Sequence, residues 1–117
     1  ETKEALDNLD DILKVEGIRM VYIGPSDLGN SLGRVPTFDQ EDPVVVEAID
    51  MILRKATEHG VAAGIHNDTP EYALHMIEEG FRFVAVGSDS RLMALAAKGV
   101  LTKMREDMPE APRSSSY

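Results

Sequence analysis

The chain has 117 residues, enough for one modest domain, and it contains no cysteine, so neither a disulfide framework nor a thiolate metal site can form. Its hydrophobic fraction of 43% and charged fraction of 28% are ordinary for a globular protein, and its lack of cysteine favours a reducing, cytoplasmic compartment. The net charge of -9 would repel phosphate-rich partners, and no apolar run approaches the roughly 20 residues of a membrane span. We therefore expect neither nucleic-acid binding nor membrane insertion.

Helical patterns alternate with short apolar strands along the chain. Three times a helical pattern ends in Glu-x-Gly or Glu-Gly, and an apolar strand follows at once. Glycine suits each helix end because it adopts positive φ without a Cβ clash. The predicted strands cover residues 18–24, 61–66 and 81–87, and their continuous apolar character is typical of strands buried on both faces of a parallel sheet.

Four helices are predicted around these strands. The first runs from residue 2 to about residue 13 and carries a single apolar stripe. The second and third begin with Asp42-Pro43 and Thr69-Pro70, where a capping residue precedes proline at the first helical position. The last runs from about residue 90 to 105. Prolines and serines then predict a disordered tail at 108–117, after one folded domain at 1–107.

This alternation of helices and strands argues for right-handed βαβ units in a parallel sheet. Two architectures fit the pattern, an open doubly wound sheet and a closed β/α barrel. A closed eight-stranded barrel needs on the order of 250 residues, so three strands would form only part of one.

Polar residues follow all three strands, at the ends where parallel β/α folds carry their chemistry. Asp68, Thr69, Ser88 and Asp89 precede helices, and helix capping is the favoured interpretation for them. Asp27 lies in a glycine-rich loop, where backbone N–H groups can approach a ligand, and is the stronger candidate for a binding residue. His66 is either a packed histidine or an acid–base group or ligand at its strand end.

The segment Val21-Tyr22-Ile23-Gly24-Pro25-Ser26-Asp27-Leu28 resembles the sixth-strand signature of the HpcH/HpaI aldolases. Residues 1–5, Glu-Thr-Lys-Glu-Ala, resemble the E-T-x-x-A segment that ends the fifth strand in that family, and the similarity continues through residues 63–65 and 83–89. Its most specific part is the Gly-Pro-Ser-Asp-Leu block with a glutamate 26 positions before the aspartate. The resemblance implies the C-terminal portion, about strands 6–8 with flanking helices, of a TIM (β/α)₈ barrel of the phosphoenolpyruvate/pyruvate superfamily.

The resemblance also implies a site and an activity. Glu1 and Asp27 match the family's ligands for one divalent cation, Mg²⁺ or Mn²⁺. Gly24, Pro25, Ser26 and Asp27 would bind pyruvate, and Ile65 and His66 would border the aldehyde. The implied function is a class II aldolase, a lyase that reversibly cleaves a 2-keto-3-deoxy sugar acid or a 4-hydroxy-2-oxo acid to pyruvate and an aldehyde. A homo-oligomer is expected, with the last helix packed on a neighbouring subunit.

No catalytic residue is assigned in this chain, because the family's catalytic arginine and histidine lie in the first half of the barrel. The chain starts at Glu1 without methionine, so we expect part of a larger protein or a truncated product. Two other functions remain open. One is a citryl-CoA or malyl-CoA lyase, which uses a similar Gly-Pro-x-Asp-Leu turn. The other is a non-catalytic half-barrel that serves as an assembly module through its exposed sheet edges.

Overall fold

The computed structural model describes residues 1–106, and the predicted tail at 108–117 lies outside these residues. The chain divides into two compact units, Glu1–Gly87 and a second unit that begins at Ser88. The predicted single domain at 1–107 stays a prediction.

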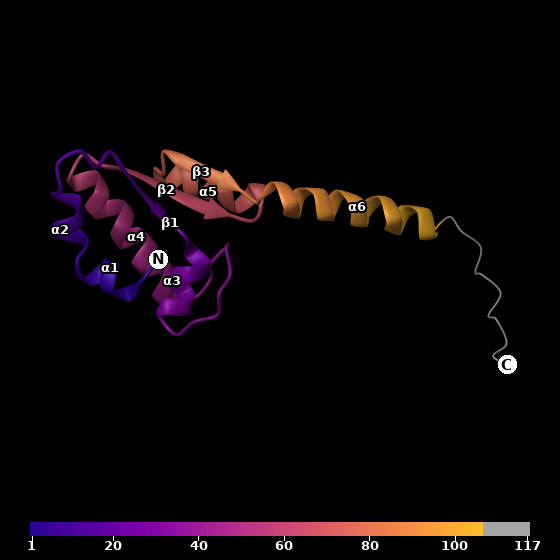
Figure 1. Cartoon of the computed structure of the whole chain (residues 1–117), viewed down its shortest axis with the longest axis horizontal. Helices are drawn as coiled ribbons and strands as arrows, with labels where there is room; N and C mark the ends of the chain where they lie inside the picture. The colour runs from indigo at the N-terminus through magenta and orange to yellow at the C-terminus, as the bar shows by residue number, and fades with distance from the viewer. Residues whose placement is uncertain (107–117) are drawn as a thin grey trace. The chain divides into compact units, whose positions relative to one another are not determined.

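The first unit contains a three-stranded parallel sheet. Its strands are β1 (Met20–Ile23), β2 (Ala62–Asn67) and β3 (Phe83–Val86), in the order β1-β2-β3. Figure 1 shows the strands side by side, joined by the helices that lie between them in sequence. Ile23 pairs with Ile65, and His66 pairs with Ala85, so all three strands end at the same edge of the sheet. The predicted parallel βαβ arrangement is confirmed.

Five helices belong to this unit, and the two with predicted caps begin where the sequence indicates. They are α1 (Lys3–Asp7), α2 (Leu9–Leu13), α3 (Pro25–Ser31), α4 (Pro43–Glu58) and α5 (Pro70–Glu79). The Asp42 carboxylate accepts a hydrogen bond from the backbone N–H of Val44, and the Thr69 hydroxyl accepts one from that of Tyr72. Gly80 ends α5 with a φ of 116°, the left-handed conformation expected of a glycine stop.

Two local predictions were wrong. The first helix is broken into α1 and α2 at Asn8, whose side-chain amide donates to the carbonyl of Glu4 at 2.9 Å. Asparagine favours such a break because its short polar side chain competes for nearby backbone groups. The segment after β1 was interpreted as a loop, but it forms α3, with Gly24 as N-cap and Pro25 in the first turn. Asp27 therefore lies in the first turn of a helix.

The core lies on one face of the sheet. Ala63, Ile65 and Asn67 alternate along β2 and are almost wholly buried, together with Ile23 of β1. Helices α3, α4 and α5 contact the strands, and α4 contributes the largest buried stripe, formed by Val45, Ala48, Ile49, Ile52 and Ala56. Burying these side chains removes apolar surface from water, which is the main stabilising term for the unit.

The opposite face of the sheet is open, although the sequence predicted strands buried on both faces. Met20, Tyr22 and Phe83 point to this face and are 43%, 42% and 52% exposed. The reason is geometric, because three strands cannot close a barrel and so cannot cover their own inner face. We call this surface the inner face.

The second unit contains one described helix, α6 (Asp89–Glu106). The Ser88 hydroxyl accepts a hydrogen bond from the backbone N–H of Arg91, which confirms the capping interpretation for Ser88. None of the residues of α6 is buried. The expected homo-oligomer stays a prediction. Across residues 1–106, no helix combines the length and the apolar character needed to cross a lipid bilayer.

Gly64 provides a test of the packing on the inner face. A Cβ at this position would lie 2.9 Å from Tyr22 Cδ2 and 3.0 Å from the carbonyl oxygen of Phe83. Because the backbone of β3 cannot move away freely, Gly64→Ala should lower the free energy of unfolding by about 1–3 kcal/mol, measured by urea titration.

Gly99→Ala is the matched control, since a Cβ at Gly99 in α6 would meet no atom within 4 Å. Removing glycine from a helix interior should stabilise α6 by up to about 1 kcal/mol. An equal destabilisation by both substitutions would contradict the packing described for Gly64.

Candidate active site

Two carboxylates converge beside Gly24, the first residue after β1. A Cβ atom placed on Gly24 would lie 3.3 Å from Glu1 Oε1 and 3.4 Å from Asp27 Oδ2, which are the nearest atoms. These two residues are 26 positions apart in the sequence. The structure thus brings together the two predicted metal ligands at the carboxyl end of a parallel strand.

Local structure positions the backbone that carries both carboxylates. Pro25 and Leu28 of α3 are buried, which anchors the helix turn that carries Asp27. Near Glu1, the backbone N–H of Lys3 donates to the Ser31 hydroxyl at 2.9 Å, so the start of α1 is tied to the end of α3. A side chain at position 24 would crowd the Glu1 and Asp27 carboxylates, so glycine leaves room for both.

The donor chemistry of this pair fits a hard divalent cation. Mg²⁺ is usually bound through one or two carboxylates and retains several water molecules. Within residues 1–106, no group of three or more histidine, cysteine, aspartate or glutamate side chains could hold a metal ion. Glu1 and Asp27 therefore suit an open site that leaves coordination positions for water and substrate, rather than a closed protein cage.

His66 is held in a row of aromatic side chains, Phe83, Tyr22, His66 and Phe38, which we call the aromatic row. The Tyr22 hydroxyl lies 3.2 Å from His66 Nδ1, and the His66 ring centroid lies 4.7 Å from that of Phe38. Tyr22 and Phe83 meet edge to face, with ring centroids 5.7 Å apart. Burial raises the pKa of Tyr22, so its hydroxyl keeps its proton at neutral pH.

The other predicted site residues differ in exposure. Gly24 and Ser26 are half-buried and Asp27 is exposed, so a ligand can reach this turn. Pro25 is fully buried, and Ile65 has no exposed surface because it packs in the core. Ile65 therefore presents no surface to a ligand in this unit, whereas His66 lies on the inner face.

Sequence patterns missed the segment 37–40, which joins the two strand ends. Asp39 accepts hydrogen bonds from the backbone N–H of Asp68 at 2.7 Å, and from the backbone N–H and hydroxyl of Thr69 at 3.0 and 2.6 Å. Gln40 is buried, and its side-chain amide donates to the carbonyls of Thr37 at 2.8 Å and Pro25 at 3.3 Å. The segment thus connects the turn that carries Asp27 to the turn that follows His66.

Asp39→Ala should loosen the end of β2. It removes an acceptor of three hydrogen bonds, so the backbone amides of Asp68 and Thr69 should exchange with solvent faster. The free energy of unfolding should fall by about 1–3 kcal/mol, as for other hydrogen bonds to charged groups. Hydrogen exchange followed by NMR measures the amides, and urea titration measures the stability.

Asp42→Ala is the control, because it removes a comparable carboxylate cap from α4. This substitution should lower stability while the Asp68 and Thr69 amides remain protected. If Asp39→Ala left those two amides unchanged, the connection between the strand ends would be wrong.

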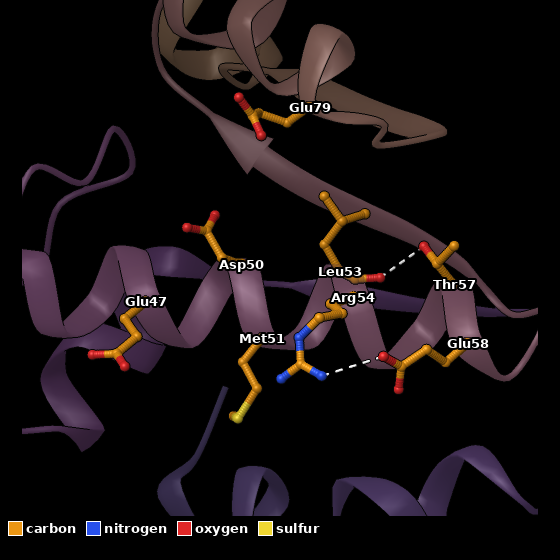
Figure 2. Close-up of a pocket in the computed structure, with 8 residues that line it drawn as sticks. All are labelled: Glu47, Asp50, Met51, Leu53, Arg54, Thr57, Glu58 and Glu79. Carbon is orange, nitrogen blue, oxygen red and sulfur yellow. Dashed lines mark hydrogen bonds and ion pairs between the residues drawn. The ribbon is translucent and has the colours of Figure 1, made fainter.

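A second concave surface lies along α4, with Glu79 of α5 at its border (Figure 2). Arg54 donates to Glu58 at 3.2 Å, and the Thr57 hydroxyl donates to the carbonyl of Leu53 at 2.8 Å. Figure 2 shows the Glu47 and Asp50 carboxylates directed away from this ion pair. The side chains converge on no common point, so the carboxyl ends of the strands remain the candidate site.

Parallel strands whose carboxyl ends gather polar residues place this chain among the parallel β/α folds. The family HpcH/HpaI aldolase/citrate lyase matches residues 1–96. A hydroxypyruvate/pyruvate aldolase of Rhizorhabdus wittichii is 40% identical over 105 residues, which cover 90% of this chain and 42% of that protein. A 2-keto-3-deoxy-L-rhamnonate aldolase of Klebsiella pneumoniae is 38% identical over 117 residues, which cover 100% of this chain and 43% of that protein.

Solved structures show the same relationship. A HpcH/HpaI aldolase/citrate lyase family protein from Burkholderia cenocepacia superposes with a TM-score of 0.82 at 28% identity, covering 90% of this chain and 40% of that one. A HpcH/HpaI aldolase from Desulfitobacterium hafniense gives a TM-score of 0.78 at 30% identity, covering 96% and 43%. The chain belongs to the HpcH/HpaI aldolase/citrate lyase family, and it spans about two-fifths of the length of the relatives it matches.

Proposed function

We propose that a complete barrel carrying this chain is a divalent-metal-dependent aldolase. It reversibly cleaves a 4-hydroxy-2-oxo acid or a 2-keto-3-deoxy sugar acid to pyruvate and an aldehyde. The observation that carries the proposal is the convergence of the Glu1 and Asp27 carboxylates beside Gly24. The aldolase names of the relatives from Rhizorhabdus wittichii and Klebsiella pneumoniae support the same chemistry.

The reaction breaks the bond between C3 and C4 of the substrate. The C4 hydroxyl loses its proton and becomes the aldehyde, while C3 gains a proton and becomes the methyl group of pyruvate. A bound Mg²⁺ or Mn²⁺ would polarise the C2 keto group and stabilise the negative charge that develops during cleavage.

In this proposal, the residues of this chain bind and orient. Glu1 and Asp27 hold the cation, and the backbone N–H groups of Ser26 and Asp27 bind the pyruvate carboxylate. Gly24 allows close approach of the substrate, because position 24 carries no side chain, and the buried Pro25 anchors the turn. At the neighbouring strand end, His66 borders the aldehyde, and the buried Ile65 supports this strand end from the core. We assign no catalytic acid or base to this chain.

Asp27→Asn should abolish pyruvate enolisation in a complete barrel carrying these residues. Without the negative charge of Asp27, the cation loses one of its two carboxylates, and exchange of the pyruvate methyl protons in D₂O should fall at least about a hundredfold. Proton NMR with pyruvate and Mg²⁺ measures this exchange without any aldehyde present.

Glu4→Gln is the matched control, since it removes a carboxylate three residues after Glu1 that lies outside the site. It should leave the exchange rate unchanged. Retained exchange in the Asp27 variant would end the aldolase proposal. Turnover only of acyl-CoA thioesters would favour a citryl-CoA or malyl-CoA lyase, and no turnover of either class would favour an assembly module.

A further inference from the structure

We propose that Gln40 is a positioning residue for the cation site, and that its side-chain amide sets where Asp27 stands relative to Glu1. Among residues 1–106, no hydrogen bond joins Gln40 to either carboxylate, so it acts through the backbone of α3. The inference rests on the proposed function and goes beyond it, because it gives a role at the site to a residue of the irregular segment between α3 and α4.

Helix α3 needs support from outside itself to hold Asp27 in place. It has only seven residues, and isolated helices of this length are unstable in water. Its N-cap, Gly24, has no side chain that could bind the free N–H groups of the first turn. Asp27 lies in that first turn and is exposed, so its position depends on what holds the buried side of α3.

Gln40 packs against this buried side. Pro25 and Gly29 are four residues apart, so they lie on one face of α3, and both are buried. The Gln40 amide nitrogen lies 3.3 Å from the carbonyl oxygen of Pro25, and a Cβ on Gly29 would lie only 2.8 Å from the same nitrogen. Since Gln40 is 3% exposed, its amide fills the space beside this face, and glycine at position 29 leaves room for it.

The chemistry of a neutral amide suits this position. The Gln40 amide nitrogen is surrounded by three carbonyl oxygens, those of Pro25, Val35 and Thr37, at 3.3, 3.3 and 2.8 Å. Carbonyl oxygens accept hydrogen bonds and cannot donate them, so the group that faces them must be a donor. Methionine has a similar length but no donor, and a glutamate carboxylate would repel the carbonyl oxygens. Glutamine therefore holds α3 in a way that neither of these residues could.

Gln40 is itself anchored to neighbouring structure. The Tyr72 hydroxyl of α5 donates to the backbone carbonyl of Gln40 at 3.0 Å. The preceding residue, Asp39, accepts three hydrogen bonds from Asp68 and Thr69 in the turn after β2. The amide that supports α3 is thus attached to the adjacent strand end rather than to a free loop.

Mn²⁺ binding to the 117-residue chain tests this role. Gln40→Met keeps the length of the side chain and removes the donor, so α3 should shift and move the Asp27 carboxylate away from Glu1. Calorimetric titration should then show a Mn²⁺ affinity about tenfold weaker, as for other groups that orient metal ligands. In the Asp27→Asn background, Gln40→Met should change the affinity much less, because it acts through the Asp27 carboxylate. An equal loss in both backgrounds would overturn the proposal.

Val61→Ala is the matched control for a general loss of stability. Val61 is buried just before β2, at the end of the strand opposite to the site, and its truncation removes core contacts. Urea titration should show that Val61→Ala and Gln40→Met both lower stability, whereas only Gln40→Met should weaken Mn²⁺ binding. Weaker binding in both variants, in proportion to the stability lost, would show a merely structural role for Gln40 and contradict the inference.

Gly29→Ala disturbs the same contact from the side of α3 and keeps every hydrogen-bond donor. Its methyl group would meet the Gln40 amide, so this variant should also weaken Mn²⁺ binding. It decides the question if circular dichroism shows that Gln40→Met does not fold, and an unchanged affinity in Gly29→Ala would then refute the role of Gln40.

The same titrations separate this inference from the proposed function. Unchanged Mn²⁺ affinity in a folded Gln40→Met variant, where Asp27→Asn loses affinity, would overturn the inference and leave the cation site standing. An unsubstituted chain that binds no Mn²⁺ would overturn both.

Discussion

The candidate site depends on one local arrangement, in which the Glu1 and Asp27 carboxylates converge beside Gly24, a residue without a side chain. Two negative groups repel each other unless solvent or a cation compensates their charge. Here they are held together by neighbouring structure, because Pro25 and Leu28 anchor one and the contact of Lys3 with Ser31 anchors the other. A divalent cation bound by both carboxylates would compensate their charge.

The rest of the unit places the carboxyl end of β2 beside the Glu1 and Asp27 carboxylates. The parallel register aligns β1 with β2, and the segment 37–40 joins the turns that follow them. The helices bury one face of the sheet, while the inner face carries the aromatic row. The same geometry explains why the inner face is exposed, since only the remaining strands of a barrel would cover it.

Much of the fold could be predicted from the sequence, because its signals are local. Asp42-Pro43 and Thr69-Pro70 start helices, and Gly80 ends one, for reasons contained within a few residues. The break at Asn8 was missed because it depends on weak competition between backbone and side-chain hydrogen bonds. Helix α3 was missed because its N-cap, Gly24, carries no capping side chain and the neighbouring glycines predict a loop. Of the site, Glu1, Asp27 and His66 were named from motif and strand position. Asp39 was not, because its contacts with Asp68 and Thr69 cross 29 or more residues and leave no periodic pattern.

The central claim is that Glu1 and Asp27 hold the same cation, and a double-mutant cycle of Mn²⁺ binding tests it most directly. Calorimetric titration of the 117-residue chain would compare Glu1→Ala, Asp27→Asn and the double variant. Because both carboxylates would serve one ion, each single substitution should weaken binding by about tenfold or more, and the double variant should lose much less than the sum of the two. Unchanged affinity in either single variant, or losses that add as for independent sites, would contradict the account.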